Sequence, residues 1–143
     1  MTTVVYSNGV LAADRRITQG GEIVGDTYKK VFRTQDGWIG AWCGTVTDGY
    51  AFAEWAINTT REDMPPRGDY VGILINPKGK VFEFEHGKPL PATRRRKFYT
   101  LGSGGTAALG ALYAGASVKK AVQVAQKIDS ASGGGVDVIE LYK

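Results

Sequence analysis

Short stretches of mainly hydrophobic residues recur along this chain, and turn-forming residues separate them in pairs. Asn8-Gly9, Asp36-Gly37 and Pro77-Lys78-Gly79 stand between the members of three such pairs. Asn-Gly and Asp-Gly between hydrophobic stretches are strong local signals for a β-hairpin. The pattern therefore predicts three hairpins, formed by residues 2–7 and 10–14, by 29–35 and 38–43, and by 70–76 and 81–85.

Three other segments have the hydrophobic spacing of helices. Thr47 or Asp48 is typical of a helix N-cap, and the stripe that follows predicts a helix to about Asn58. An Ala- and Leu-rich helix is expected from about 104 to 114. In the third segment hydrophobic residues recur at i, i+3, i+4, i+7 and i+10, which predicts another helix. That stripe comprises Val118, Ala121, Val122, Ala125 and Ile128.

The segments between these elements are polar and rich in glycine or proline, so we expect loops at 15–28, 59–69 and 86–97. A final strand is predicted from the hydrophobic residues Val136, Val138, Ile139 and Leu141. Because strands and helices do not alternate regularly, this order predicts an α+β fold with antiparallel sheets. The length of 143 residues favours a single domain over 1–143.

Composition narrows the class of protein further. With 43% hydrophobic and 22% charged residues and a net charge of +4, the chain has a globular composition. No hydrophobic run reaches about 18 residues and nothing resembles a signal peptide, so we expect no membrane contact and a cytoplasmic protein. One cysteine, Cys43, cannot form an internal disulfide, and one histidine, His86, cannot build a zinc site. We therefore assign no metal ligands and no cofactor from the sequence.

Residues for ordinary hydrolase chemistry are scarce. A Ser-His-Asp arrangement would need His86, which lies at a strand end and is more simply a surface residue, while Cys43 is typical of a small core residue. Gly102–Gly105 lacks the residues of a phosphate-binding loop. A base is available instead at the chain start, because removal of Met1 before the small Thr2 would free an α-amine, and such amines titrate at about 7.7–8. A threonine hydroxyl and its own amine form a known nucleophile–base pair.

Several short motifs follow one another along the chain. They are Thr2-Thr3-Val4-Val5, Val10-Leu11-Ala12-Ala13-Asp14-Arg15-Arg16, Lys29-Lys30-Val31, Trp42-Cys43-Gly44-Thr45-Val46-Thr47-Asp48, Leu101-Gly102-Ser103-Gly104-Gly105 and Lys127-Ile128-Asp129-Ser130-Ala131-Ser132-Gly133-Gly134. In this order they resemble the motifs of proteasome β-type subunits and of bacterial HslV, which are N-terminal nucleophile threonine hydrolases. The resemblance spans almost the whole chain, and the last motif is closer to the β-subunits than to HslV.

The resemblance implies a catalytic role for seven residues. Thr2 would be the nucleophile, with its amine as general base, and Lys30 would lower the pKa of its hydroxyl. Asp14 would hold Lys30, and the Gly44 N–H would bind the oxyanion of the tetrahedral intermediate. A further group would orient the Thr2 amine and relay its proton: Ser103, Asp129 and Ser132.

Simpler structural roles are open for several of these residues. Asp14 could be an ordinary carboxylate at a strand end, Lys30 a solvated side chain, Ser103 an N-cap and Ser132 a turn hydroxyl. However, Asp14 and Lys30 lie sixteen residues apart, Lys30 and Gly44 fourteen, and Asp129 and Ser132 three. These spacings agree with the family without a gap, which favours the catalytic interpretation.

The same alignment implies a substrate pocket lined by Ile17, Tyr28, Phe32, Trp42 and Val46. A place in the hydrophobic core is the alternative for these side chains, above all for Phe32. With Trp42 at the floor, the pocket would be shallow and would favour small or medium apolar side chains of a substrate.

The family relationship also implies an architecture and partners. It implies a four-layer αββα sandwich and, as substrates, peptides or unfolded proteins cleaved inside a homo-oligomer of one ring or stacked rings. An ATPase unfoldase is a compatible partner, although no docking element is identifiable. Only one helix fits between Asp48 and the strand at 70, where the family has two. We therefore expect one helical layer to be reduced, and the family's ring size cannot be carried over.

Three alternatives belong to other classes of function. A non-catalytic scaffold subunit would keep the fold and could retain Met1, but it has no need of the whole set of polar residues. A nucleic-acid-binding module would use Arg94–Lys97 with Phe98 and Tyr99, a modest basic patch for which we expect no nucleic-acid partner. A hydrolase of small amides would keep the chemistry and need no chamber.

Overall fold

The computed structural model describes residues 2–91 and 96–142, so Met1 lies outside the described residues. Its first sheet has the strand order β10-β1-β2-β11. These strands are β1 (Val4–Ser7), β2 (Val10–Asp14), β10 (Tyr99–Leu101) and β11 (Val136–Glu140). Hairpin β1–β2 closes through Asn8-Gly9, as predicted, and the two strands pair in antiparallel register from Val4↔Ala13 to Ser7↔Val10.

A second sheet contains the other two predicted hairpins and has the order β5-β6-β7-β8-β9. Its strands are β5 (Val31–Arg33), β6 (Ile39–Gly44), β7 (Tyr70–Ile75), β8 (Val81–Glu85) and β9 (Lys88–Pro89). All the pairings in both sheets are antiparallel among the described residues. The short β9 lies where we expected only a loop, because Phe84 and Glu85 of β8 pair with it.

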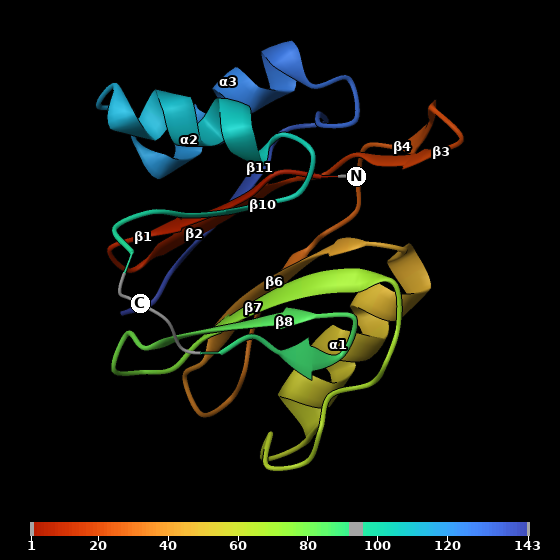
Figure 1. Ribbon diagram of the computed structural model, residues 1–143, viewed down its shortest axis with the longest axis vertical. Helices are drawn as coiled ribbons and strands as arrows, with labels where there is room; N and C mark the ends of the chain where they lie inside the picture. The colour runs from red at the N-terminus through yellow and green to blue at the C-terminus, as the bar shows by residue number, and fades with distance from the viewer. Residues whose placement is uncertain (1, 92–95, 143) are drawn as a thin grey trace.

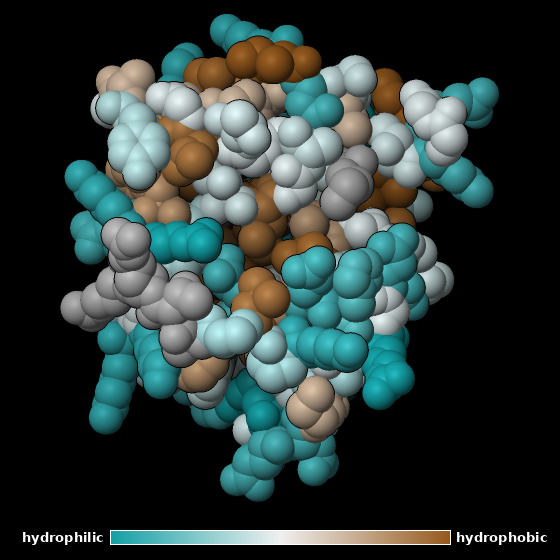
Figure 2. All heavy atoms as spheres, in the orientation of Figure 1, coloured by the Kyte–Doolittle hydropathy of each residue, from teal (hydrophilic) through white to brown (hydrophobic). Residues whose placement is uncertain are grey.

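Three helices pack on the sheets. Helix α2 (Gly105–Tyr113) and helix α3 (Val118–Ile128) lie over the first sheet, whereas α1 (Val46–Asn58) lies against the second (Figure 1). In Figure 2 hydrophobic side chains gather at the end that carries α2 and α3, and this face is mostly polar around α1. The chain thus has the predicted α+β fold with antiparallel sheets, and α1 is the one helix between Asp48 and β7.

Three hydrophobic clusters lie between the packed elements. They form because side chains alternate between the two faces of each strand. Val4 and Tyr6 of β1 belong to a cluster shared by the two sheets, while the intervening Val5 belongs to a cluster with α2 and α3. A third cluster joins the second sheet to Phe52 and Ala56 of α1. Because successive strand residues point to opposite faces, the four-stranded and the five-stranded sheet each contribute hydrophobic side chains from both faces.

Two predicted helices differ from the sequence pattern at their ends. Helix α1 begins at Val46 with Thr45 as N-cap, rather than the expected Thr47 or Asp48. Thr45 instead directs its hydroxyl to Asp69 Oδ2, at 3.1 Å, which fixes the first turn from outside the helix. Helix α3 buries its predicted stripe except for Ile128, whose side chain is 70% exposed at the helix end.

The expected loop at 15–28 is in fact a hairpin. Strands β3 (Ile17–Gln19) and β4 (Glu22–Gly25) form a separate two-stranded sheet that projects beside the start of the chain (Figure 1). Gly20-Gly21 makes the turn, and the ladder is irregular between Ile17 and Thr18. Polar residues and glycines obscured the strands in the sequence, because Ile23 and Val24 of β4 remain exposed and give no buried face.

No helix within residues 2–91 and 96–142 is long and apolar enough to cross a membrane.

Candidate active site

Thr2 lies at the meeting point of three segments far apart in sequence. The register of hairpin β1–β2 brings Asp14, the last residue of β2, beside Thr3, and the Asp14 N–H donates to the Thr3 carbonyl at 3.2 Å. Lys30 immediately precedes β5, and its Nζ lies within hydrogen-bonding distance of Thr2 and Asp14. The Thr2 hydroxyl donates to Asp14 Oδ1 and accepts from Lys30 Nζ. The polar group Thr2–Asp14–Lys30 is buried, with Thr2 2% exposed and the other two fully covered.

The Asp14 carboxylate is fully hydrogen-bonded in this buried position. Its Oδ1 accepts from the Thr3 N–H at 3.1 Å and from Lys30 Nζ at 2.9 Å. Its Oδ2 accepts from the N–H groups of Gly133 and Arg16, at 2.9 and 3.2 Å. A buried carboxylate without such partners would be strongly disfavoured. Asp14 is therefore a buried, fully hydrogen-bonded carboxylate at the end of β2.

Lys30 is a buried ammonium with three acceptors. Besides Thr2 and Asp14, its Nζ donates to the Arg16 carbonyl at 2.6 Å. Burial lowers the pKa of Lys30, and the charge and hydrogen bond of Asp14 oppose that shift. A positive charge in contact with the Thr2 hydroxyl favours its ionised form. The arrangement can therefore support a threonine alkoxide.

A second polar group, Ser103–Asp129–Ser132, adjoins the first through Thr3. Asp129 Oδ2 accepts from the hydroxyls of Ser103 and Ser132, at 2.6 and 2.7 Å. The Ser132 hydroxyl also lies 2.7 Å from Thr3 Oγ1. Burial raises the pKa of Asp129, but the two hydroxyl donors and the Ala131 N–H outweigh it and hold the pKa below its usual value. Asp129 is thus an ionised acceptor at the end of a hydroxyl chain.

The Gly-Ser-Gly segment packs directly on the Thr2 backbone. Gly102 has φ +88°, and a Cβ there would lie 1.9 Å from the Thr2 carbonyl oxygen. The Gly104 N–H donates to that same oxygen at 3.4 Å. Gly104, rather than Ser103, is the N-cap of α2, so the N-cap role for Ser103 is wrong. Only glycine permits this approach at 102.

A cavity of about 570 Å³ opens beside Thr2 and Lys30. Gly44 lies in its wall with φ +122°, and a Cβ there would meet the Asp69 carbonyl oxygen at 2.5 Å. Four of the five expected pocket residues line the cavity: Ile17, Tyr28, Trp42 and Val46. The remaining lining residues are Thr18, Gln19, Val24, Thr45, Thr47 and Asp69.

Phe32 does not line the cavity, and its assignment to the pocket is wrong. It belongs to the hydrophobic cluster beneath α1, with its ring edge-on to Phe52 at 6.2 Å between centroids. The absence of a side chain at Gly40, its partner in the β5–β6 ladder, makes room for that ring. Phe32 is therefore a residue of the hydrophobic core, the alternative that the sequence left open for it.

Several residues that contact the site were not predicted from the sequence to have a role in it. Thr3 links the two polar groups through its hydroxyl, and main-chain atoms of Arg16 and Gly133 bind the side chains of Lys30 and Asp14. Backbone donors and acceptors leave no trace in a sequence. The β3–β4 hairpin had one local signal in the sequence, since two glycines between short stretches that contain β-branched residues are typical of a tight hairpin.

The residues considered for other kinds of chemistry do not line the cavity beside Thr2. Cys43 is buried, and burial raises the pKa of its thiol to about 11. His86 is largely exposed, with Nδ1 3.2 Å from the Gly68 carbonyl. In the part of the chain that the structure describes, no group of three His, Cys, Asp or Glu side chains could hold a metal ion. Of the basic patch, Arg94 and Arg95 lie outside the described residues, and Arg96 and Lys97 are exposed.

No protein-family model and no curated protein matches this chain. Among solved structures, HslV from Trypanosoma brucei is similar, with TM-score 0.69 and 19% identity over 96% of this chain and 97% of that one. Thiobacillus denitrificans BPH is similar with TM-score 0.69 and 23% identity, over 98% and 97%. Its complex with epoxomicin gives TM-score 0.66 and 22% identity, over 99% of both chains. The chain therefore has the fold of HslV-type subunits over nearly its whole length, as the sequence motifs indicated.

Proposed function

We propose that this protein is a threonine-type endopeptidase that uses Thr2 as an N-terminal nucleophile after removal of Met1. One observation carries the proposal: the Thr2 hydroxyl lies between Lys30 Nζ and Asp14 Oδ1, and Thr2 lines a cavity. A buried ion pair is costly to maintain. Its placement against a threonine hydroxyl is readily explained if that hydroxyl must ionise.

The first half of the reaction forms an ester. Without Met1, the Thr2 amine accepts the proton of the Thr2 hydroxyl, and Oγ1 attacks the carbonyl carbon of the substrate. The carbonyl electrons move to oxygen, and the Gly44 N–H stabilises the resulting oxyanion. The protonated amine then gives its proton to the leaving nitrogen as the C–N bond breaks. The Lys30 charge stabilises Oγ1 when it loses its proton.

The second half releases the product. The Thr2 amine takes a proton from a water molecule, whose oxygen attacks the ester carbon, and the bond to Oγ1 breaks as Oγ1 regains a proton. The Ser103–Asp129–Ser132 group lies next to the Thr2 peptide through Thr3 and Gly104, where it can orient the free amine and pass on its proton. The sum is hydrolysis of one amide bond.

The substrates that we propose are peptides or unfolded proteins. We propose one domain, a four-layer αββα sandwich whose α1 side is reduced to a single helix. Assembly into a cytoplasmic homo-oligomer, as one ring or stacked rings, would enclose the cavities, and an ATPase unfoldase could supply substrate. HslV and BPH, the proteins of similar fold, support this proposal.

Intact-mass spectrometry before and after treatment with epoxomicin tests the proposal. Epoxomicin is a peptide epoxyketone, and such reagents need both a threonine hydroxyl and a free α-amine to form their ring adduct; it is also the ligand of the BPH complex. We expect loss of Met1 and one adduct per chain, absent in Thr2→Ala. A chain that retains Met1 and forms no adduct would favour the non-catalytic scaffold instead.

The assembly state of the protein distinguishes a peptidase from a hydrolase of small amides. An enclosed oligomer, measured by light scattering, would accompany peptide cleavage. Hydrolysis of small amides by a monomer would overturn the peptidase assignment and leave the Thr2 chemistry intact.

A further inference from the structure

We propose that Asp69 selects substrates with a positively charged side chain, lysine or arginine, in the cavity beside Thr2. The inference rests on the proposed function and names its substrate class. It replaces the expectation, drawn from Trp42 alone, that the pocket prefers small or medium apolar side chains.

The charges around the cavity lead to this inference. Only two of the described side chains that line it are charged at neutral pH, Lys30 and Asp69. Lys30 is fully buried and paired with Asp14 at 2.9 Å, so its charge is compensated. The Asp69 side chain, in contrast, is 77% exposed. The cavity therefore offers a substrate one accessible charge, and it is negative.

The backbone around Asp69 is held in place by the start of α1. The Asp69 N–H donates to Asp48 Oδ2 at 2.8 Å, and its carbonyl accepts from the Thr45 N–H at 2.9 Å. Asp69 Oδ2 accepts from the Thr45 hydroxyl at 3.1 Å. These bonds join the end of the 59–69 connector to the residue after Gly44. The carboxylate is thus fixed close to the proposed oxyanion site.

The other walls suit the stem of a long cationic side chain. Ile17, Val24, Trp42 and Val46 line the same cavity as Thr2 and Asp69 and supply apolar side chains to it. Lysine and arginine pack their methylene groups on apolar surface while the charged end reaches a polar or hydrated position. A cavity of about 570 Å³ has room for such a side chain and its neighbouring residues.

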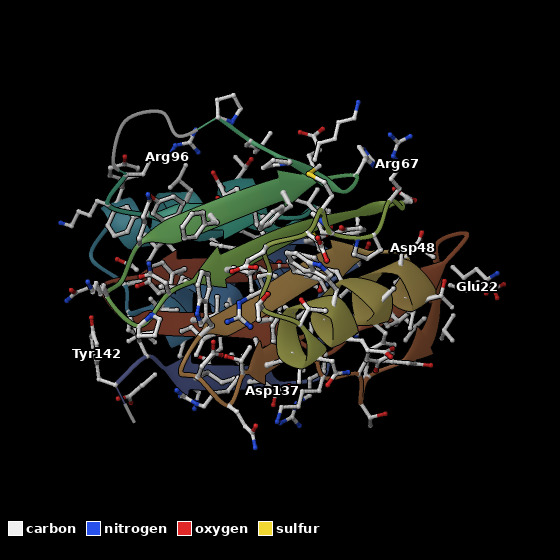
Figure 3. All side chains as sticks on the ribbon, turned by 90° about the horizontal axis from the view of Figure 1, so that it is seen from below. Glu22, Asp48, Arg67, Arg96, Asp137 and Tyr142 are labelled. Carbon is white, nitrogen blue, oxygen red and sulfur yellow. The ribbon has the colours of Figure 1, made fainter. Side chains whose placement is uncertain are left out.

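Neighbouring charges leave the carboxylate available. His86 Nδ1 lies 4.0 Å from Asp69 Oδ1 and adds a positive charge only when protonated. Arg67 lies at the periphery, at the same end of the molecule as Asp48 and Glu22 (Figure 3). The ion pairs found among the described residues do not join Arg67 to Asp69.

Two peptide epoxyketones that differ only in the reactive residue, lysine or leucine, test the inference. Rates of adduct formation are followed by intact mass at pH 8. Exposed ion pairs contribute about 0.2–1 kcal/mol, so we expect Asp69→Asn to lower the lysine-to-leucine rate ratio about 1.5- to 5-fold. Asp69→Lys should lower it further, because repulsion replaces attraction. Glu54→Gln, which removes an exposed carboxylate from α1 outside the cavity, should leave the ratio unchanged.

The outcomes separate this inference from the function on which it depends. Adducts with both reagents, and a ratio that stays constant in Asp69→Asn and Asp69→Lys, would overturn the role of Asp69 and leave the Thr2 hydrolase intact. No adduct with either reagent would overturn the proposed function, and the substrate class with it. Circular dichroism of each variant verifies that it is folded.

Discussion

The two polar groups that meet at Thr2 and Thr3 differ in burial and in how their charge is balanced. In Thr2–Asp14–Lys30 the carboxylate and ammonium are fully buried and neutralise each other. In Ser103–Asp129–Ser132 neutral hydroxyls, rather than a cation, balance the carboxylate, and Asp129 and Ser103 are partly or largely exposed. The first group holds charges in a fixed arrangement, whereas the second can exchange protons with water.

This difference predicts that substitutions in the two groups affect stability and activity differently. Loss of one charge from the buried group leaves the other without a partner, so stability and activity should fall together. Loss of the carboxylate from the exposed group leaves hydroxyls that water can satisfy, so activity should fall with little loss of stability. Three substitutions test this contrast.

Lys30→Met should have the largest effect. It keeps the length of the side chain but leaves Asp14 buried without its cation, so we expect a loss of about 3–5 kcal/mol in the free energy of unfolding. Cleavage should also fall at least about 100-fold. Denaturant titration and peptidase assays measure the two quantities.

Lys29→Met is the matched control, because Lys29 is adjacent and exposed. It should change stability by less than about 0.5 kcal/mol. A stability of Lys30→Met within about 1 kcal/mol of the unmodified protein would show that the Asp14–Lys30 pair is not buried as described.

Gly102→Ala should have an intermediate effect, because it disturbs the contact between the second group's segment and the Thr2 backbone. The added Cβ combines a left-handed backbone with a 1.9 Å approach to the Thr2 oxygen, which should cost about 2–4 kcal/mol. Gly20→Ala serves as comparison, since Gly20 has φ +58° but nothing within 4 Å of the added atom. It should cost about 1–2 kcal/mol. If thermal unfolding shows that Gly102→Ala and Gly20→Ala lose the same amount of stability, the close approach at Gly102 is contradicted.

Asp129→Asn should have the smallest effect on stability, about 1 kcal/mol at pH 7, with a fall in cleavage of about 10- to 100-fold. The hydroxyls lose an ionised acceptor but remain close to water. Asp63→Asn, at an exposed position in the connector, should change neither quantity.

The pH dependence of Asp129→Asn sharpens this prediction. Because the pKa of Asp129 is lowered in the folded protein, its stabilisation is present above the unfolded pKa and is lost as pH falls through the folded value. The difference in unfolding free energy between the two proteins should therefore shrink as pH falls below about 4. A difference that grows on acidification would assign the effect to another group.

Local sequence signals located most of the fold correctly. The hairpin turn at Asn8-Gly9 and the helical stripe from Val118 to Ala125 depend on neighbours in the chain, so both were predictable. Hairpin β3–β4 was missed, because its strands bury no continuous face and alternation was the signal for strands. Phe32 was misassigned, because a strand residue near a pocket can face either side of the sheet.

The polar side chains of the site could be named from the motifs alone, which contain all of Thr2, Asp14, Lys30, Ser103, Asp129 and Ser132. Which of them are buried, which share hydrogen bonds and which charge remains accessible depends on how the folded elements pack. Asp69 illustrates the reason: nothing near it in the chain suggests a role, and it reaches the cavity only because β6 and β7 pair and bring Tyr70 opposite Gly44. Burial and charge compensation arise from contacts between distant segments, and these exist only once the sheets have assembled.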